Sequence, residues 1–338
     1  MPENNVPDPQ FAEVFEHSNG QMFPAGLDIL LLRDRAEKRN AEARQALGPP
    51  PAGICESDIN IPVRGGDSVA AHVYAPSDDN VPTKWPIFVF FHGGGFCIGS
   101  HKDDMGSNRC IVLKAHVVVV SIDYRLAPEY PFPQGILDAF DALCWIARNA
   151  QAIHSLASVD AGLIVGGTSA GGSIANAVVY LNRDQECPAP VTGQFLSVAP
   201  LLPYPAVPIK YQDDYRSVEQ NKPFAIPSFE VTQRFIEAYS PDIASPLMVP
   251  AIHPKGHAGI PSTYLQVCGL DVLRDEGLIY ERILREEGGI ATRLDLYPGL
   301  PHHFWEFFPQ LKGQIEKRNE DTVAGILWLL KNRQNKAN

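Results

Sequence analysis

Residues 163–172 read LIVGGTSAGG. The apolar opening is typical of a buried strand, residues 167–171 match the pattern Gly-x-Ser-x-Gly, and the segment 171–181 is predicted to be helical. A sharp turn from strand to helix needs small neighbours around its central residue, because larger side chains would obstruct the strained backbone. The stretch therefore predicts a nucleophile turn with Ser169 at its tip. The pentapeptide alone is also compatible with an ordinary tight turn that caps a helix.

Short apolar runs alternate with helical segments on both sides of this turn. Such runs suit strands that are buried on both faces of a sheet. The expected strands are 87–91, 117–122, 163–165, 195–198, 264–267 and 293–297. The expected helices are 108–114, 135–149, 171–181, 275–287 and 320–331. The alternation predicts the α/β class, with a mostly parallel central sheet flanked by helices.

Two regions depart from this alternation. Before the sheet, 25–47 is predicted to be a helix that ends at a Gly-Pro-Pro-Pro run, and 59–63 with 69–74 to be an antiparallel hairpin. Later, the segment 203–261 is rich in proline and aromatic residues and contains one helical piece at 228–239. We therefore expect a core of 56–202 and 262–338, an N-terminal cap segment of 1–55 and a cap insertion of 203–261, with a pocket at the strand ends.

Composition excludes several functions. The chain has 338 residues, a formal net charge of -11 and no Lys/Arg-rich stretch, which argues against nucleic acid and favours neutral or hydrophobic small molecules. Its six cysteines show no Cys-x-x-Cys spacing, so neither a zinc site nor a disulfide framework is indicated. Dinucleotide, P-loop and His-Glu-x-x-His motifs are absent from the sequence, and we expect no cofactor and no metal.

Two features of the sequence bear on the cellular location of the protein. The N-terminus is polar and acidic, unlike a secretory signal. The most apolar stretch, 111–122, is interrupted by Lys114 and His116 and is too short to span a bilayer. We therefore expect a cytoplasmic protein without stable membrane insertion.

Three further sites complete a candidate active centre. A serine hydroxyl is a weak nucleophile unless an imidazole removes its proton and a carboxylate orients that imidazole. Asp271 follows the predicted strand 264–267, and His302 follows the last predicted strand. His303 remains an alternative base, and the rivals for the acid are Asp123, Asp138, Asp275 and Glu276. His92-Gly93-Gly94-Gly95 lies after the strand 87–91, where backbone N–H groups could stabilise an oxyanion.

Together these motifs resemble the hormone-sensitive-lipase-like esterases, a branch of the α/β-hydrolases with many microbial carboxylesterases. The similarity begins near Ile87 and continues to the C-terminus. It is carried by HGGG at 92–95, DYRLAPE at 123–129, GTSAGG at 167–172, GLD at 269–271 with RDE at 274–276, and Gly299, His302 and Phe304. The resemblance implies an α/β-hydrolase fold with a helical cap, in the subgroup with the Gly-Thr-Ser elbow.

The resemblance also assigns roles. It implies Ser169, Asp271 and His302 as the catalytic triad, and the N–H groups of Gly94, Gly95 and Ala170 as the oxyanion hole. His92 would support the loop through hydrogen bonds, and Gly93 would mainly serve its turn. The family contains monomers and dimers, so a homodimer stays open.

The expected activity is hydrolysis of small neutral or hydrophobic carboxylic esters through an acyl-enzyme. An acyltransferase or a lactone hydrolase would use the same residues, and a ligand-binding or dehydratase relative is a further alternative. Phe96, Phe224 and Phe229, with Phe235 and Tyr239, are candidates for an apolar acyl pocket. The alternative is that these aromatic side chains only pack the cap onto the core.

Overall fold

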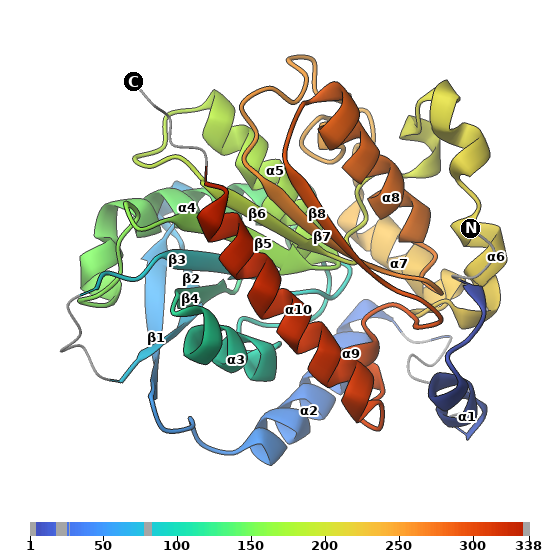
Figure 1. Cartoon of the computed structure of the whole chain (residues 1–338), viewed down its shortest axis with the longest axis horizontal. Helices are drawn as coiled ribbons and strands as arrows, with labels where there is room; N and C mark the ends of the chain where they lie inside the picture. Colours follow the sequence, from blue (N-terminus) through green and yellow to red (C-terminus); the bar gives the residue numbers. More distant parts are fainter. Residues whose placement is uncertain (1–4, 18–25, 27, 78–82, 334–338) are drawn as a thin grey trace.

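The sheet is the centre of the molecule. A computed structural model describes residues 5–17, 26, 28–77 and 83–333 of the chain. Eight strands form one sheet in the order β1-β2-β4-β3-β5-β6-β7-β8 (Figure 1). They are β1 Ile54–Pro62, β2 Ser68–Pro76, β3 Ile87–Phe91, β4 Val118–Ile122, β5 Leu163–Thr168, β6 Gly193–Ser197, β7 Thr263–Cys268 and β8 Thr292–Tyr297.

The strand directions confirm the predicted mixture. β1 pairs with β2 as an antiparallel hairpin, and β2 is antiparallel to β4. All other neighbours, from β4 through β3 to β8, run parallel. Because parallel strands share one carboxyl edge, the loops that follow β3, β5, β7 and β8 meet at the same end of the sheet.

Helices cover both faces of the sheet, as the alternating pattern predicts. Their bounds are α1 Pro9–His17, α2 Ile29–Leu47, α3 Met105–Ala115, α4 Gln134–Ile153, α5 Ala170–Asp184, α6 Ser217–Asn221, α7 Phe229–Tyr239, α8 Arg274–Arg282, α9 Phe304–Phe307 and α10 Lys312–Lys331. Side chains of α4 and α5 share one core with β3 to β5, and those of α3 and α10 belong to a second core. The two pairs of helices lie on opposite faces of the sheet (Figure 1). None of the helices in these described ranges is long and apolar enough to cross a membrane.

Some predicted boundaries were wrong. α10 begins at Lys312 instead of at 320, because its first turns are polar and give no apolar periodicity to detect. The helix predicted at 275–287 ends as α8 at Arg282 and continues as a wider π-type turn over Ile283–Glu287. The first expected helix begins at Ile29 with Asp28 as its N-cap, whose carboxylate accepts from Leu31 N–H at 2.8 Å. Residues 25 and 27 of that prediction lie outside the described residues.

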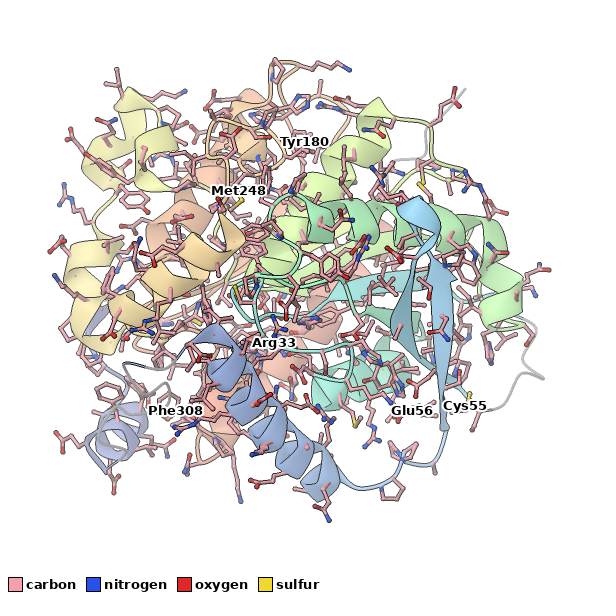
Figure 2. The ribbon with its side chains drawn as sticks, turned by 180° about the vertical axis from the view of Figure 1, so that it is seen from behind. Arg33, Cys55, Glu56, Tyr180, Met248 and Phe308 are labelled. Carbon is pink, nitrogen blue, oxygen red and sulfur yellow. The ribbon has the colours of Figure 1, made fainter. Side chains whose placement is uncertain are left out.

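Two separate segments lie over the carboxyl edge of the sheet. The segment 203–261 contributes α6, α7 and several short 3₁₀ turns, and α7 lies beside α2 (Figure 2). Arg33 of α2 donates to Cys97 O at 2.8 Å and to Ala127 O at 2.6 Å, and its guanidinium pairs with Glu129. These contacts attach α2 to the loops that follow β3 and β4.

Candidate active site

Ser169 lies on a strained turn between β5 and α5. Its φ of 53° and ψ of -124° place its backbone in a conformation that residues other than glycine rarely adopt. The neighbouring glycines permit the turn because the backbone of β3 lies too close for a side chain at either position. A Cβ on Gly171 would lie 2.1 Å from Phe91 O, and a Cβ on Gly167 would lie 2.5 Å from the same atom. The strand-turn-helix predicted from residues 163–172 is therefore present, and it holds the serine side chain above the sheet edge.

His302 connects this serine to a carboxylate. Its Nδ1 lies 2.6 Å from Asp271 Oδ2, and its Nε2 lies 3.0 Å from Ser169 Oγ. Asp271 follows β7 and His302 follows β8, so neighbouring parallel strands bring both residues to the serine. Because a carboxylate only accepts hydrogen bonds, Nδ1 carries the proton of the neutral ring and Nε2 can accept the serine proton. This arrangement can activate the hydroxyl for attack on a carbonyl.

Backbone and amide contacts hold Asp271 in place. Its Oδ1 accepts from Leu273 N–H at 2.9 Å, so Oδ2 faces the imidazole. The Asn221 amide donates to Asp271 O at 2.8 Å and to Gly269 O at 3.0 Å. Asn221 ends α6 and was missed by the sequence reasoning, since nothing near it resembles a motif.

The rival carboxylates are engaged elsewhere. Asp123 contacts His101, and Asp138 forms a two-point ion pair with Arg125. Asp275 binds Arg274 and accepts from the N–H groups of Arg216 and Ser217. Glu276 accepts from the N–H groups of Leu201 and Leu202. Glu276 is nevertheless close to the site. Burial and the charge of Asp271 raise the pKa of its carboxyl to about 7, against the hydrogen bonds that it accepts.

His303 points away from the serine. Its φ of 53° turns the chain, and its Nε2 lies 3.1 Å from Glu306 Oε2 and 3.8 Å from Asp104 Oδ1. Burial opposes its charge, but the carboxylates of Glu306 and Asp104 prevail and raise the pKa of His303. The geometry thus gives the two consecutive histidines different partners.

The glycine loop after β3 passes in front of the serine. Gly94 and Gly95 have φ values of 121° and 58°, and both line the same cavity as Ser169 and Ala170. A Cβ on Gly94 would lie 2.0 Å from Ile98 O, so only glycine fits this turn. Backbone N–H groups in such a loop, together with the one that opens α5, can stabilise negative charge on a carbonyl oxygen.

His92 lies beneath this loop. It is fully buried, and its Nδ1 lies 2.7 Å from Gly93 O, while its ring stacks on Tyr124 at 4.4 Å. The Tyr124 hydroxyl donates to His92 O at 2.8 Å. Burial lowers the pKa of His92, so a neutral ring donates from Nδ1 and holds the loop.

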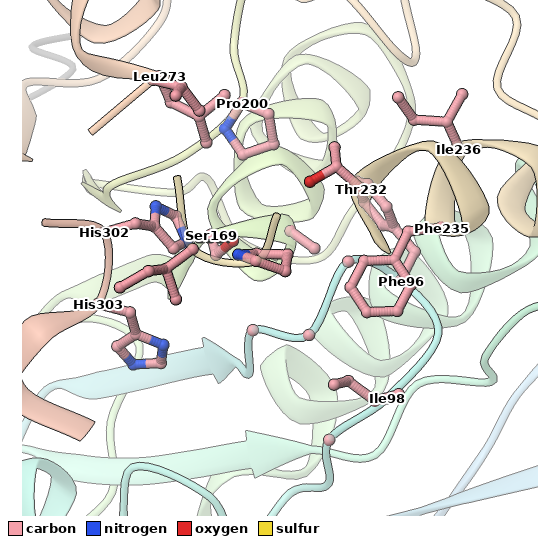
Figure 3. Close-up of a pocket in the computed structure, with 18 of the residues that line it drawn as sticks. Phe96, Ile98, Ser169, Pro200, Thr232, Phe235, Ile236, Leu273, His302 and His303 are labelled. Atoms are coloured by element: carbon pink, nitrogen blue, oxygen red, sulfur yellow. Dashed lines mark hydrogen bonds between the residues drawn. The ribbon is translucent and has the colours of Figure 1, made fainter. Parts of the chain in front are cut away.

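A cavity of about 340 Å³ opens from Ser169 (Figure 3). Phe96 and Phe229 line it, as do Phe235 and Tyr239; Phe96 stacks on Tyr239 with ring centroids 3.9 Å apart. Phe224 does not belong to the lining within the described residues, and this part of the prediction is corrected. Its ring packs on Phe11 and Phe15 of α1 instead, at 6.1 and 5.6 Å.

Sequence reasoning missed much of this lining. The missed residues come from the N-terminal helix, the cap and the loops after the strands, and include Arg39, Asn40, Asp103, Asp104, Pro200, Ile226, Thr232, Ile236, Met248, Leu273, Glu306 and Phe307. No local pattern marks them, because each segment contributes only a few side chains to a shared cavity.

Comparison with known proteins also identifies α/β-hydrolases as the relatives of this chain. A family model described as alpha/beta hydrolase fold matches residues 88–306. An AB hydrolase superfamily protein of Schizosaccharomyces pombe is 33% identical over 329 residues, which are 96% of this chain and 94% of that protein. Carboxylesterase NlhH of Mycobacterium tuberculosis is 31% identical over 282 residues, 81% of this chain and 83% of that protein.

One solved structure extends the comparison to three dimensions. The crystal structure of vibralactone cyclase superposes with a TM-score of 0.85 at 31% identity, and covers 98% of this chain and 97% of that chain. The region matched by the family model contains Ser169, Asp271 and His302.

Proposed function

Because this chain belongs to the hormone-sensitive-lipase-like carboxylesterases of the α/β-hydrolase fold, we propose that it hydrolyses small neutral or hydrophobic esters with Ser169 as nucleophile. In this proposal His302 is the base and Asp271 the acid that orients it. One observation carries the assignment: His302 lies between Asp271 Oδ2, at 2.6 Å, and Ser169 Oγ, at 3.0 Å. Such a series is the geometry that nucleophilic catalysis by serine requires.

The reaction proceeds in two balanced steps. Ser169 Oγ attacks the ester carbonyl carbon while its proton moves to His302 Nε2, and the N–H groups of Gly94, Gly95 and Ala170 stabilise the oxyanion. The carbon–alkoxy bond then breaks, and His302 returns the proton to the departing alcohol. His302 then takes a proton from water, whose oxygen attacks the acyl carbon; the bond from the acyl carbon to Ser169 Oγ breaks, His302 returns the proton to Oγ, and the acid leaves.

The cavity supports a small substrate. Its volume of about 340 Å³ is near the lower end of the range for ligand pockets. The side chains of Phe96, Phe235 and Tyr239 give it an apolar wall. A short or medium acyl chain is the group that this wall would bury most favourably.

A second candidate uses the same acyl-serine. If a hydroxyl group enters in place of water, the products are a new ester or, from a hydroxyacyl group, a lactone. The similarity to vibralactone cyclase, which covers 98% of this chain, supports lactone formation as the second candidate. In lactone hydrolysis, Ser169 attacks the lactone carbonyl in the reverse of this ring closure, and water then releases the hydroxy acid from the hydroxyacyl-serine.

The test compares wild type with Ser169→Ala on p-nitrophenyl esters of increasing acyl length. We expect rapid p-nitrophenol release by the wild type and none above background by the variant, whose circular dichroism and melting temperature should match. Turnover that persists in the folded variant would remove Ser169 from the mechanism. Mass spectrometry of products from hydroxyacyl esters separates hydrolysis, which gives the hydroxy acid, from lactone formation.

A further inference from the structure

The cavity next to Ser169 has two chemically different ends. One end is formed by aromatic and aliphatic side chains, among them Phe96, Phe235 and Ile236. The other end includes six polar or charged lining residues that are linked by contacts with one another, and we call this group the polar end: Arg39, Asn40, Asp103, Asp104, His303 and Glu306. Nothing in the two-step reaction described above uses the polar end.

The polar end is a preorganised network. Asn40, only 8% exposed, donates from Nδ2 to Asp103 Oδ2 at 2.8 Å and accepts from Arg39 at 3.0 Å. Arg39 also donates to Glu306 Oε1 at 3.0 Å, and Glu306 Oε2 lies 3.1 Å from His303. Residues of α2 and α9 that line the cavity are thereby joined to one another.

Each carboxylate in this network already has a basic partner. Glu306 pairs with Arg39 at 3.0 Å and lies 3.1 Å from His303 Nε2, and Asp103 is bound by the Arg44 guanidinium at 3.2 Å. An additional ion would compete with these existing pairs and would also lose its hydration shell. A hydroxyl group, in contrast, can donate to a carboxylate and accept from a guanidinium at the same time. The chemistry of the polar end therefore fits an uncharged group with several hydroxyls.

The general acid decides which part of an ester faces this end. His302 Nε2 must reach the alkoxy oxygen to protonate it, so the alcohol part of the ester lies on the imidazole side of Ser169. Figure 3 shows His303 on the same side of Ser169 as His302, with Phe96 and Phe235 on the other side. The alcohol therefore extends toward the polar end and the acyl chain toward the aromatic end.

We propose that the polar end selects esters whose alcohol part is uncharged and hydroxylated, such as a polyol, with Glu306, Arg39 and Asn40 as specificity-determining residues. This inference rests on the proposed ester hydrolysis. It assigns the alcohol and acyl parts of the substrate to opposite ends of one cavity.

The first experiment compares three butyrate esters that differ only in the alcohol: glyceryl monobutyrate, propyl butyrate and butyrylcholine. Since all three give the same butyryl-enzyme, the alcohol can influence only steps up to acylation, and kcat/KM is the quantity to measure. We expect the glyceryl ester to exceed the propyl ester by about tenfold or more, the effect of one or two added hydrogen bonds. Equal values, or a preference for butyrylcholine, would overturn the proposal.

Two variants test the assignment of the ends. Glu306→Gln keeps the shape but removes the charge, and should lower the glyceryl-to-propyl ratio by about threefold or more. Ile236→Ala, at the opposite end, should move the preferred acyl chain to greater length and keep the glyceryl-to-propyl ratio. If Ile236→Ala alters the alcohol preference and Glu306→Gln the acyl preference, the orientation is reversed and the proposal is wrong.

The design separates this inference from the proposed function. Absence of Ser169-dependent hydrolysis of every ester would refute ester hydrolysis itself. Ser169-dependent hydrolysis without any alcohol preference would leave that function standing and refute only the role of the polar end. If Glu306→Gln melts at a lower temperature than wild type, the glyceryl-to-propyl ratio is measured in Arg39→Gln, which removes the charge of the residue that donates to Glu306.

Discussion

The imidazole rings of His302 and His303 stand at 80° to each other, although the two residues are consecutive. His302 Nε2 lies 3.0 Å from Ser169 Oγ, whereas His303 Nε2 lies 3.1 Å from Glu306 Oε2. The left-handed backbone at His303, with φ 53°, produces this divergence. One histidine therefore contacts the nucleophile, and its neighbour contributes to the polar end.

Replacement of each histidine should separate these contributions. His302→Ala should remove the burst of p-nitrophenol that reports acylation and lower kcat by about 10⁴-fold or more, because no base remains for Ser169. His303→Ala should retain the burst, since the Asp271, His302 and Ser169 contacts do not involve its ring. Stopped-flow absorbance measures both. A burst in His302→Ala, or its loss in His303→Ala, would exchange their roles.

The carboxylate of Asp271 should matter through the orientation of the ring. Asp271→Asn keeps the shape but offers an N–H where His302 needs an acceptor, so the imidazole turns to the wrong tautomer. We expect kcat to fall about 10⁴-fold with little change in the melting temperature. Asp67→Asn, an exposed carboxyl of the β1–β2 hairpin, is the matched control. Near-normal kcat in Asp271→Asn would show that another acid supports His302.

The glycine loop offers a test of the oxyanion hole. A Cβ on Gly95 would lie 2.3 Å from the ring of Phe235, which packs against this loop, so Gly95→Ala must displace either the ring or the loop with its N–H groups. We expect kcat/KM to fall about a hundredfold, the usual cost of one lost oxyanion donor. The comparison is Gly66→Ala, since Gly66 has a similar positive φ of 83° but no heavy atom within 4 Å.

That control isolates backbone strain from displacement of the loop. Gly66→Ala should lower the free energy of unfolding by about 1 kcal/mol, the strain of a left-handed alanine, and leave kcat/KM at the wild-type value. Similar kinetic losses in both variants would mean that general destabilisation, and not the position of the loop, lowers activity.

Glu276 should make stability depend on pH. Burial, reinforced by Asp271, raises the pKa of this carboxyl to about 7 from 4.5. The folded state therefore keeps a proton that the unfolded state has already lost, and stability falls as pH rises from 4.5 to about 7. The loss attributable to this group is about 3 kcal/mol.

Glu276→Gln provides the measurement. Gln can still accept from the N–H groups of Leu201 and Leu202, both of which bind a single oxygen at 2.8 Å, but it does not titrate. Urea unfolding at pH 5 and pH 8 should show the variant gaining stability relative to wild type at the higher pH. A constant difference between the two proteins at both pH values would contradict the raised pKa.

Much of the fold was predictable because its signals are local. Strands buried on both faces appear as apolar runs, and every predicted run lies within or overlaps one of the eight strands. The polar start of α10 escaped detection because helix periodicity requires an apolar stripe, which its first turns lack. The partners of the polar end escaped for another reason: Arg39 and Glu306 are 267 residues apart, and neither belongs to a motif.

The aromatic residues of the cap show the same limit. Phe224 and Phe229 lie five residues apart in one proline-rich stretch, yet Phe229 lines the cavity while Phe224 packs on Phe11. An aromatic side chain gains similar free energy by burial against either surface, so composition cannot distinguish the two.

The sequence by itself determined the strand, turn and helix around Ser169 and the order in which Asp271 and His302 follow, because these depend on glycine conformation and on apolar periodicity along a short stretch of chain. Tertiary structure alone decided which of two adjacent histidines meets Ser169, and that Arg39, Asn40 and Glu306 form one end of its cavity. Those outcomes depend on side-chain directions and on contacts between distant segments, which exist only after the helices have packed around the sheet.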